Sequence, residues 1–165
     1  MSLLNGFTYR FRITLPNGQV IEDRFDNLMP QEGVDYYADL FLANVAPINA
    51  FYVGIYEGNY TPTLATKATD IPGAIGECTA YSAAGRPQWQ GTYDGVSLLS
   101  NENNLAEFVL TADKTLYGAF ITSSSTKADG GGVLVSIGRF PSPRTLPAGT
   151  TFTCWAEIPL VPTDF

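Results

Sequence analysis

Hydrophobic and polar residues alternate in the segment FTYRFRITLPNGQVIEDRF, residues 7–25. A period of two is typical of strands that bury one face. Between the two halves, Pro16 suits the first corner of a type I turn, and Gly18 suits the left-handed position that closes a three-residue loop. The segment therefore predicts a β-hairpin. Its register places apolar residues together on one face and an opposite-charge pair on the other: Ile13 with Ile21, Tyr9 with Phe25, and Arg12 with Glu22.

The period changes to that of a helix in MPQEGVDYYADLFLANVAP, residues 29–47. Acidic residues crowd the start of this segment, where the helix dipole favours negative charge, and Pro47 cannot continue a helix. We therefore expect one helix from about Val34 to Ala46. Apolar residues recur along it at helical spacing: Val34, Tyr37, Phe41 and Val45.

From residue 50 onward the pattern predicts short strands separated by turn residues. The expected strands are residues 51–57, 76–82, 96–100, 106–111, 115–123, 133–140 and 150–161. The expected turns lie at Gly58-Asn59, Ile71-Pro72-Gly73, Gly85-Arg86-Pro87, Asp94-Gly95, Asp113-Lys114 and PSPRTLPAG, residues 141–149. The last strand places five apolar residues on one face: Phe152, Cys154, Ala156, Ile158 and Leu160. Together these elements predict a mainly β fold, an antiparallel β-sandwich or jelly roll with an N-terminal hairpin and one helix.

A chain of 165 residues, 45% of them hydrophobic, is expected to form a single domain over residues 1–165 with a core large enough to fold. Within it, the hairpin and helix of residues 1–48 can form a lobe on the sandwich that residues 50–162 are expected to build. The amino-terminal residues show no basic stretch leading into an apolar core, and no run of 18 apolar residues follows. We therefore expect neither export nor a membrane partner.

The formal net charge of −7 argues against nonspecific binding to nucleic acid, which depends on Lys and Arg displacing counterions from phosphates. Three arginines in the hairpin, Arg10, Arg12 and Arg24, are expected to lie on a solvated strand face. Because the chain has no histidine and its two cysteines lack Cys-x-x-Cys spacing, zinc sites of the finger type are excluded. Cys78 and Cys154 are expected to be small buried apolar residues, with a disulfide as the alternative.

The loop SSSTKADGGG, Ser123 to Gly132, resembles a phosphate-binding loop only in composition. Lys127 precedes the glycines and a predicted strand follows them, whereas a phosphate loop needs the lysine after the glycines and then a helix. We interpret it as a connection in which glycines supply positive φ angles. Lys127 follows Ser124 by three residues, but in a loop rather than on a helix, so catalysis is not expected there.

Other chemistry is weakly marked. A histidine-dependent triad is impossible, no motif marks a pair among the sixteen acids for glycoside hydrolysis, and the calcium-like spacings offer one carboxylate each. No catalytic, metal or cofactor residue is therefore assigned, and no enzyme activity or cofactor is expected. Trp89 and Trp155 are interpreted as packing residues, with sugar stacking as the alternative.

Two stretches, residues 51–89 and 116–160, resemble a group of small structural proteins encoded in the head-gene region of tailed bacteriophages. The resemblance lies in the order of a YVG strand, an RP-W element, a GAF strand with a Ser/Thr/Lys/Gly loop, and a Pro-rich turn before a last TT strand. Residues 1–50 fall outside it.

The resemblance implies a virion protein, made in the host cytoplasm, that decorates the capsid surface as a cement protein. Its implied partners are the major capsid protein, whose neighbouring subunits it would bridge, and itself, as a dimer or trimer. A tail or neck component, a carbohydrate-binding surface module and a glycan hydrolase are the alternatives. If the protein docks on a shell, its contact surface is expected to carry exposed aromatic residues.

Overall fold

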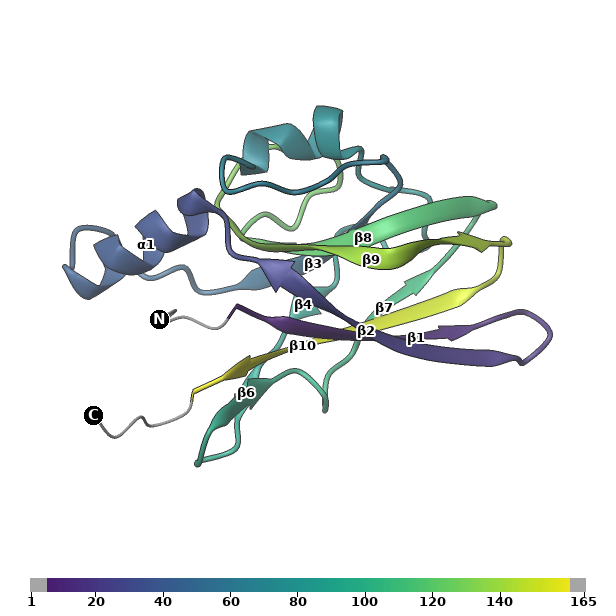
Figure 1. Ribbon diagram of the computed structural model, residues 1–165, viewed down its shortest axis with the longest axis horizontal. Helices are drawn as coiled ribbons and strands as arrows, with labels where there is room; N and C mark the ends of the chain where they lie inside the picture. The colour runs from purple at the N-terminus through teal and green to yellow at the C-terminus, as the bar shows by residue number, and fades with distance from the viewer. Residues whose placement is uncertain (1–5, 161–165) are drawn as a thin grey trace.

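The computed structural model describes residues 6–160, whose strands form one curled antiparallel sheet (Figure 1). The strand order is β4-β3-β8-β9-β2-β1-β10-β6-β5, and β7 also pairs with β10. The strands are β1 Thr8–Thr14, β2 Val20–Leu28, β3 Phe51–Tyr56, β4 Gln88–Trp89, β5 Thr92–Tyr93, β6 Leu98–Ser100, β7 Ala106–Val109, β8 Lys114–Thr122, β9 Leu134–Leu146 and β10 Thr151–Pro159. The mainly β fold is confirmed, whereas the sandwich or jelly roll stays a prediction.

The predicted hairpin is present with the predicted register. Ile13 pairs with Ile21, Tyr9 with Phe25 and Arg12 with Glu22. The turn is the expected three-residue loop: the Leu15 N–H donates to the Gln19 carbonyl at 2.9 Å, and Gly18 has a φ of +85°.

The N-terminal hairpin lies in the middle of the sheet. Every residue of β1 pairs with β10, and the end of β2 pairs with β9 through Asn27 and Leu28. Toward the start of β2 no residue pairs with β9, and the Arg144 side chain of β9 reaches across to β2. Its Nη2 lies 2.7 Å from Asp23 Oδ2, and its guanidinium packs over the Phe11 ring.

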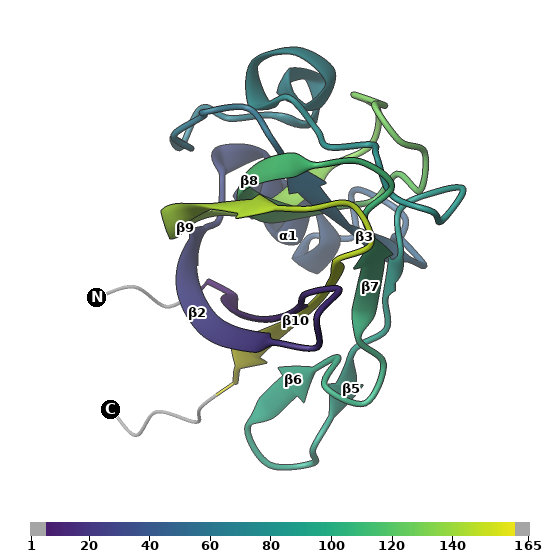
Figure 2. The same cartoon turned by 90° about the vertical axis from the view of Figure 1, so that its right-hand side faces the viewer.

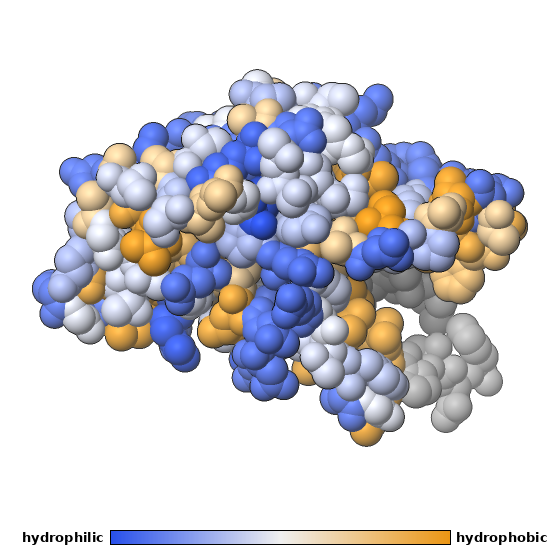
Figure 3. All heavy atoms as spheres, turned by 180° about the vertical axis from the view of Figure 1, so that it is seen from behind, coloured by the Kyte–Doolittle hydropathy of each residue, from blue (hydrophilic) through white to orange (hydrophobic). Residues whose placement is uncertain are grey.

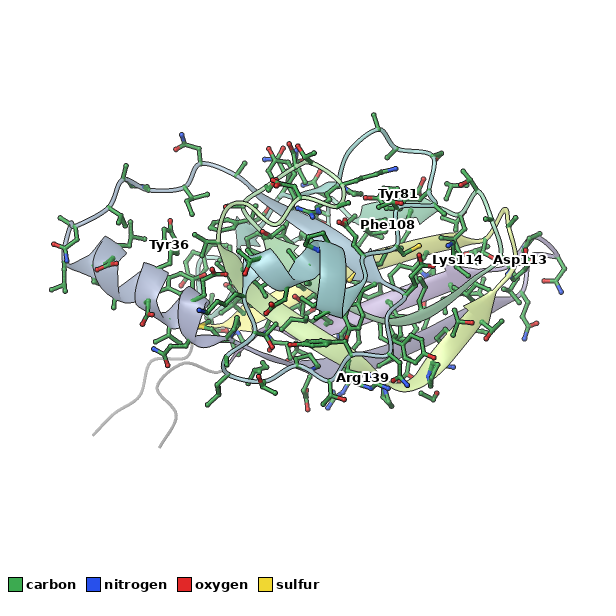
Figure 4. All side chains as sticks on the ribbon, turned by 90° about the horizontal axis from the view of Figure 1, so that it is seen from above. Tyr36, Tyr81, Phe108, Asp113, Lys114 and Arg139 are labelled. Atoms are coloured by element: carbon green, nitrogen blue, oxygen red, sulfur yellow. The ribbon has the colours of Figure 1, made fainter. Side chains whose placement is uncertain are left out.

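The strands curl around a central space (Figure 2), and the main core cluster is rich in buried aromatic side chains. Tyr9 stacks on Phe25 with ring centroids 4.9 Å apart, and Phe140 meets Phe25 edge-on at the same separation. The Tyr9 hydroxyl donates to Ser136 Oγ at 2.7 Å, so its one polar atom is satisfied. Figure 4 shows Tyr81 and Phe108 side by side, and their rings meet edge-on at 4.9 Å. Alternation along the strands thus builds an aromatic core.

Trp89 links the two ends of the sheet. It lies on the edge strand β4, and only two residues separate it from β5, the opposite edge strand. Its indole N–H donates to the Ala156 carbonyl on β10 at 3.3 Å, and its ring meets Phe7 edge-on.

The one predicted helix is displaced. Helix α1 spans Gln31–Phe41, not Val34 to Ala46, and it ends well before Pro47. Distant contacts set its start, because the Gln31 N–H donates to the Leu64 carbonyl. Its buried residues are Gly33 and Tyr36. The chain also forms short helical segments at Ala68–Asp70 and Ile71–Ile75, and the second covers the expected turn at Ile71-Pro72-Gly73.

Two other boundaries differ from the sequence prediction. Residues 76–82 do not form a strand; they make two isolated bridges, Glu77 with Tyr56 and Tyr81 with Leu110. Residues 141–146, expected in a turn, extend β9 to Leu146. Its prolines are tolerated because the β8–β9 register shifts between Leu116 and Gly118, leaving a bulge where ladder hydrogen bonds are not required. No helix within residues 6–160 is long and apolar enough to cross a bilayer.

Both cysteines are free and fully buried, as predicted. Burial raises the pKa of the Cys154 thiol, and it also raises the pKa of Cys78. We expect neither thiol to react with a disulfide reagent at pH 8 in the native protein, and both to react once urea unfolds it. A fast-reacting thiol in the native protein would contradict this burial.

The same pKa shifts give stability a pH dependence. Because the folded-state thiol pKa values are raised, the native state keeps protons that the unfolded chain releases. The stabilisation is therefore complete below the unfolded thiol pKa of about 8.5 and is lost as pH rises above it. Urea midpoints measured between pH 7 and 10 should fall. In a variant with both cysteines replaced by alanine, the decrease of the urea midpoint between pH 7 and pH 9 should be smaller.

Candidate interaction surfaces

Helix α1 is anchored at its first half. The Cβ that an alanine would add at Gly33 lies 3.0 Å from the Val135 Cα, so the helix approaches the β9 backbone closely. The Glu32 carboxylate accepts hydrogen bonds from the Ala68 and Leu134 N–H groups, at 2.9 and 2.8 Å. The Tyr36 hydroxyl accepts one from the Ile48 N–H at 2.9 Å. These contacts fix the helix, and its far end projects from the sheet (Figure 1).

The projecting end carries unburied apolar side chains. Phe41 is 90% exposed, Leu42 is 70% exposed and Val45 is 39% exposed. From behind, apolar side chains gather at this end of the molecule, seen on the right (Figure 3). The sequence pattern had placed Phe41 and Val45 on the helix's apolar stripe, but the helix stops at Phe41 and both point away from the core. We call Asp39, Phe41, Leu42 and Val45 the α1 tip.

The α1 tip is acidic as well as apolar. Asp39 lies one position before Leu40 in the last turn, and no Lys or Arg occurs in the sequence between Arg24 and Lys67. An apolar surface beside an unbalanced carboxylate suits a partner that offers both an apolar contact and positive charge.

The backbone within this projecting end is strained, because Ala43, between Leu42 and Val45, has a φ of +56°. A side chain in the left-handed region costs about 1–2 kcal/mol, whereas glycine adopts it freely. We expect Ala43→Gly to raise the free energy of unfolding by up to about 1 kcal/mol, after the entropy of glycine in the unfolded chain is subtracted. Ala46→Gly, at an exposed position without positive φ, should lower it slightly. Urea titrations of both variants test this, and equal shifts would contradict it.

A second apolar projection is the β5–β6 hairpin, where Val96 is 72% exposed and Tyr93 is 51% exposed. The predicted Asp94-Gly95 turn is present, with Gly95 at a φ of +82°. The Asp94 carboxylate accepts hydrogen bonds from the N–H groups of three residues: Val96, Ser97 and Leu98. These bonds lower its pKa and hold the turn in one conformation. The turn motif could have located this surface from the sequence.

The glycine-rich loop joins β8 to β9, as interpreted from the sequence. A buried ion pair that the sequence did not reveal fixes it: Arg86 Nη2 and Nε each lie 2.8 Å from the Glu77 carboxylate. Arg86 also donates to the carbonyls of Ser124 and Asp129, and Glu77 accepts the Ala128 N–H. Of the loop glycines only Gly132 has positive φ. No periodic pattern marks Arg86, which lies in an expected turn.

Lys127 is engaged within the fold. Its ammonium donates to the carbonyls of Thr79 and Tyr81, at 3.2 and 2.8 Å, and lies 3.7 Å from the centroid of the Tyr81 ring. Desolvation lowers the pKa of this lysine. With these contacts in place, the ammonium serves the loop's packing rather than an anion.

Neither tryptophan offers an open ring face. Trp89 is half-buried and packs against Phe7, and Trp155 is 8% exposed. The three arginines of the hairpin are exposed, as expected. Within residues 6–160 no group of three or more acidic or cysteine side chains is placed to hold a metal ion.

No protein-family model matches the chain, and no curated protein is significantly similar to it.

Proposed function

We propose that the protein is a phage structural protein that decorates an assembled capsid and stabilises it by bridging neighbouring coat subunits. The observation that carries the proposal is the pair of apolar projections, the α1 tip and the β5–β6 hairpin, which extend from different parts of the sheet (Figure 1). Bridging requires more than one contact surface, and exposed aromatic side chains are typical of such contacts. The resemblance of residues 51–89 and 116–160 to small phage head proteins favours the same proposal.

The energetics of decoration fit a rigid β protein. A protein that binds the assembled shell, and not free coat subunits, stabilises the shell by mass action. Repetition on a lattice adds avidity, because contacts after the first are intramolecular. A net charge of −7 suits an outward position, since it repels packaged DNA. A jelly roll or sandwich would be the finer description of the fold in this role.

The direct test is co-sedimentation of the purified protein with capsids of its parent phage that lack it, followed by counting copies per particle. We expect saturable binding at a copy number that matches the symmetry of the shell. Saturation at a handful of copies would favour the alternative of a tail or neck component. An absence of binding would contradict decoration and would direct attention to the carbohydrate-binding alternative, which the packed tryptophans do not favour.

A variant locates the contact. Val96→Asp places a charge on the β5–β6 hairpin, and we expect the Kd for capsids to rise at least about tenfold because that carboxylate would be desolvated on docking. Leu64→Asp is the matched control, since Leu64 is 63% exposed and lies beside the first turn of α1. Both variants should unfold at the wild-type urea concentration. Equal binding by the two variants would rule out the hairpin as the contact.

A further inference from the structure

A cationic hollow lies on the outer face of the N-terminal hairpin. Arg24, Arg10 and Trp155 lie in a row across β2, β1 and β10, because the register pairs Arg10 with Arg24 on one side and with Trp155 on the other. The hollow has a volume of about 350 Å³, and it is lined by Arg10, Phe11, Glu22, Asp23, Arg24 and Trp155. It combines two guanidinium groups with Trp155, which is 8% exposed.

The acids that line the hollow are already paired. Glu22 Oε1 lies 2.6 Å from Arg12 Nε, and Asp23 Oδ2 lies 2.7 Å from Arg144 Nη2. The Arg24 guanidinium has no ion-pair partner among residues 6–160. With those acids paired to other arginines, the positive charge left at the hollow lies at Arg24 and its neighbour Arg10.

Arg10 is only weakly neutralised, since its Nε lies 3.7 Å from Glu157 Oε2. Like charges directly opposite each other on paired strands destabilise a sheet. Arg10 and Arg24 are such a pair, so a carboxylate from a partner would relieve their repulsion.

Most other cations of the protein serve the fold. In the described part of the chain, five of them contact acids, carbonyls or rings within the protein: Arg86, Lys114, Lys127, Arg139 and Arg144. Apart from Lys67, which lies beside the first turn of α1, the cations that remain available to a partner are therefore Arg10 and Arg24 on the N-terminal hairpin. The α1 tip shows the opposite character, with exposed Phe41 and Leu42 next to Asp39.

We propose that the α1 tip of one copy docks into the cationic hollow of a second copy. Phe41 then packs over the guanidinium groups and the Trp155 edge, where cation–π attraction adds to apolar burial. Asp39 then pairs with Arg24 or Arg10, a charge-assisted contact. Because the tip and the hollow lie on different parts of the surface, the contact gives a reciprocal dimer, a closed ring or, where the rotation does not close, an open filament.

This contact extends the proposed function by naming the self-contact within the decorating assembly. It uses the α1 tip and leaves the β5–β6 hairpin of each copy for the shell, so an oligomer presents several hairpins at once and gains avidity. A single small contact is weak, and we expect assembly in roughly the micromolar range that falls as salt screens the charges.

Sedimentation velocity of the full chain over a concentration series, without capsids, tests the proposal. We expect wild-type oligomers, and at least about a tenfold increase in the dissociation constant for Phe41→Asp and for Arg24→Asp. Leu64→Asp should assemble like the wild type. The Phe41, Arg24 and Leu64 side chains are exposed, so each variant should fold, and near-ultraviolet circular dichroism is the check.

Mixing the two defective variants gives the sharpest outcome. Phe41→Asp keeps an intact hollow and Arg24→Asp keeps an intact tip, so an equimolar mixture should form one-to-one heterodimers at concentrations at which each variant alone is monomeric. A wild-type protein that stays monomeric at all concentrations, or a mixture that stays monomeric, would overturn the proposal. Because the assembly test contains no capsids, it can exclude the self-contact without excluding capsid binding. The co-sedimentation test can likewise exclude capsid binding without excluding the self-contact.

Discussion

Replacing Arg86 by methionine is expected to lower the free energy of unfolding by about 3–5 kcal/mol. Both side chains of the Arg86–Glu77 pair are fully buried, so the substitution leaves the Glu77 carboxylate without its counter-charge in the protein interior. It also removes the donors to the Ser124 and Asp129 carbonyls and the contact of the guanidinium with the Phe120 ring. Urea unfolding followed by tryptophan fluorescence measures the loss.

A second variant separates the cost of an unpaired charge from the value of the pair. The double variant Arg86→Met with Glu77→Leu removes both charges, and we expect it to be more stable than Arg86→Met alone. Arg86→Lys should also be destabilised, because one ammonium cannot reproduce the fork that reaches a carboxylate and two carbonyls. A double variant that lost as much as the sum of the two single variants would show that the pair itself is not coupled.

The loop fixed by the Arg86–Glu77 pair was predicted from the sequence, whereas the ion pair was not. The order of residues within 123–132 and the strand predicted after them argued against a phosphate site and favoured a connection between strands. The ion pair depends on Glu77 and Arg86, which come from two segments outside the loop. Nothing in their spacing marks them, and the structure alone shows that they meet beneath the loop.

Sequence patterns predicted correctly the elements whose contacts lie within one short segment of the chain. The N-terminal hairpin was predicted to its register because alternation and turn chemistry reside within residues 7–25. Helix α1 was displaced because its start depends on Leu64, far along the chain. In the displaced helix, Phe41, which recurs with other apolar residues at helical spacing, is the last residue and is 90% exposed, so the α1 tip followed from the structure.

The prolines before the last strand caused a different error, because residues that belong to a strand were predicted to form a turn. Pro141 and Pro143 read as a turn, yet they lie within β9, where a bulge removes the need for their missing N–H groups. Composition thus predicted the mainly β class, but contacts between distant strands decided where each strand ends.

Gly118→Ala is expected to lower the free energy of unfolding by about 2–4 kcal/mol. A Cβ at Gly118 on β8 would overlap the Gly138 carbonyl of β9 and the Tyr56 hydroxyl. That hydroxyl donates to the same carbonyl at 3.1 Å, and burial raises the pKa of Tyr56. The added methyl group therefore forces β8 and β9 apart and breaks a buried hydrogen bond.

Gly73→Ala is the matched control. Nothing lies within 4 Å of a Cβ at Gly73, and its φ is not positive, so the substitution should be neutral or stabilise by about 0.5–1 kcal/mol in the helical segment Ile71–Ile75. Urea midpoints of the two variants test the difference. Adding Tyr56→Phe should not rescue Gly118→Ala, because the Gly138 carbonyl, a backbone group, remains the nearest obstacle. A full rescue would instead assign the clash to the tyrosine side chain and show that the β8–β9 backbone spacing tolerates a methyl group.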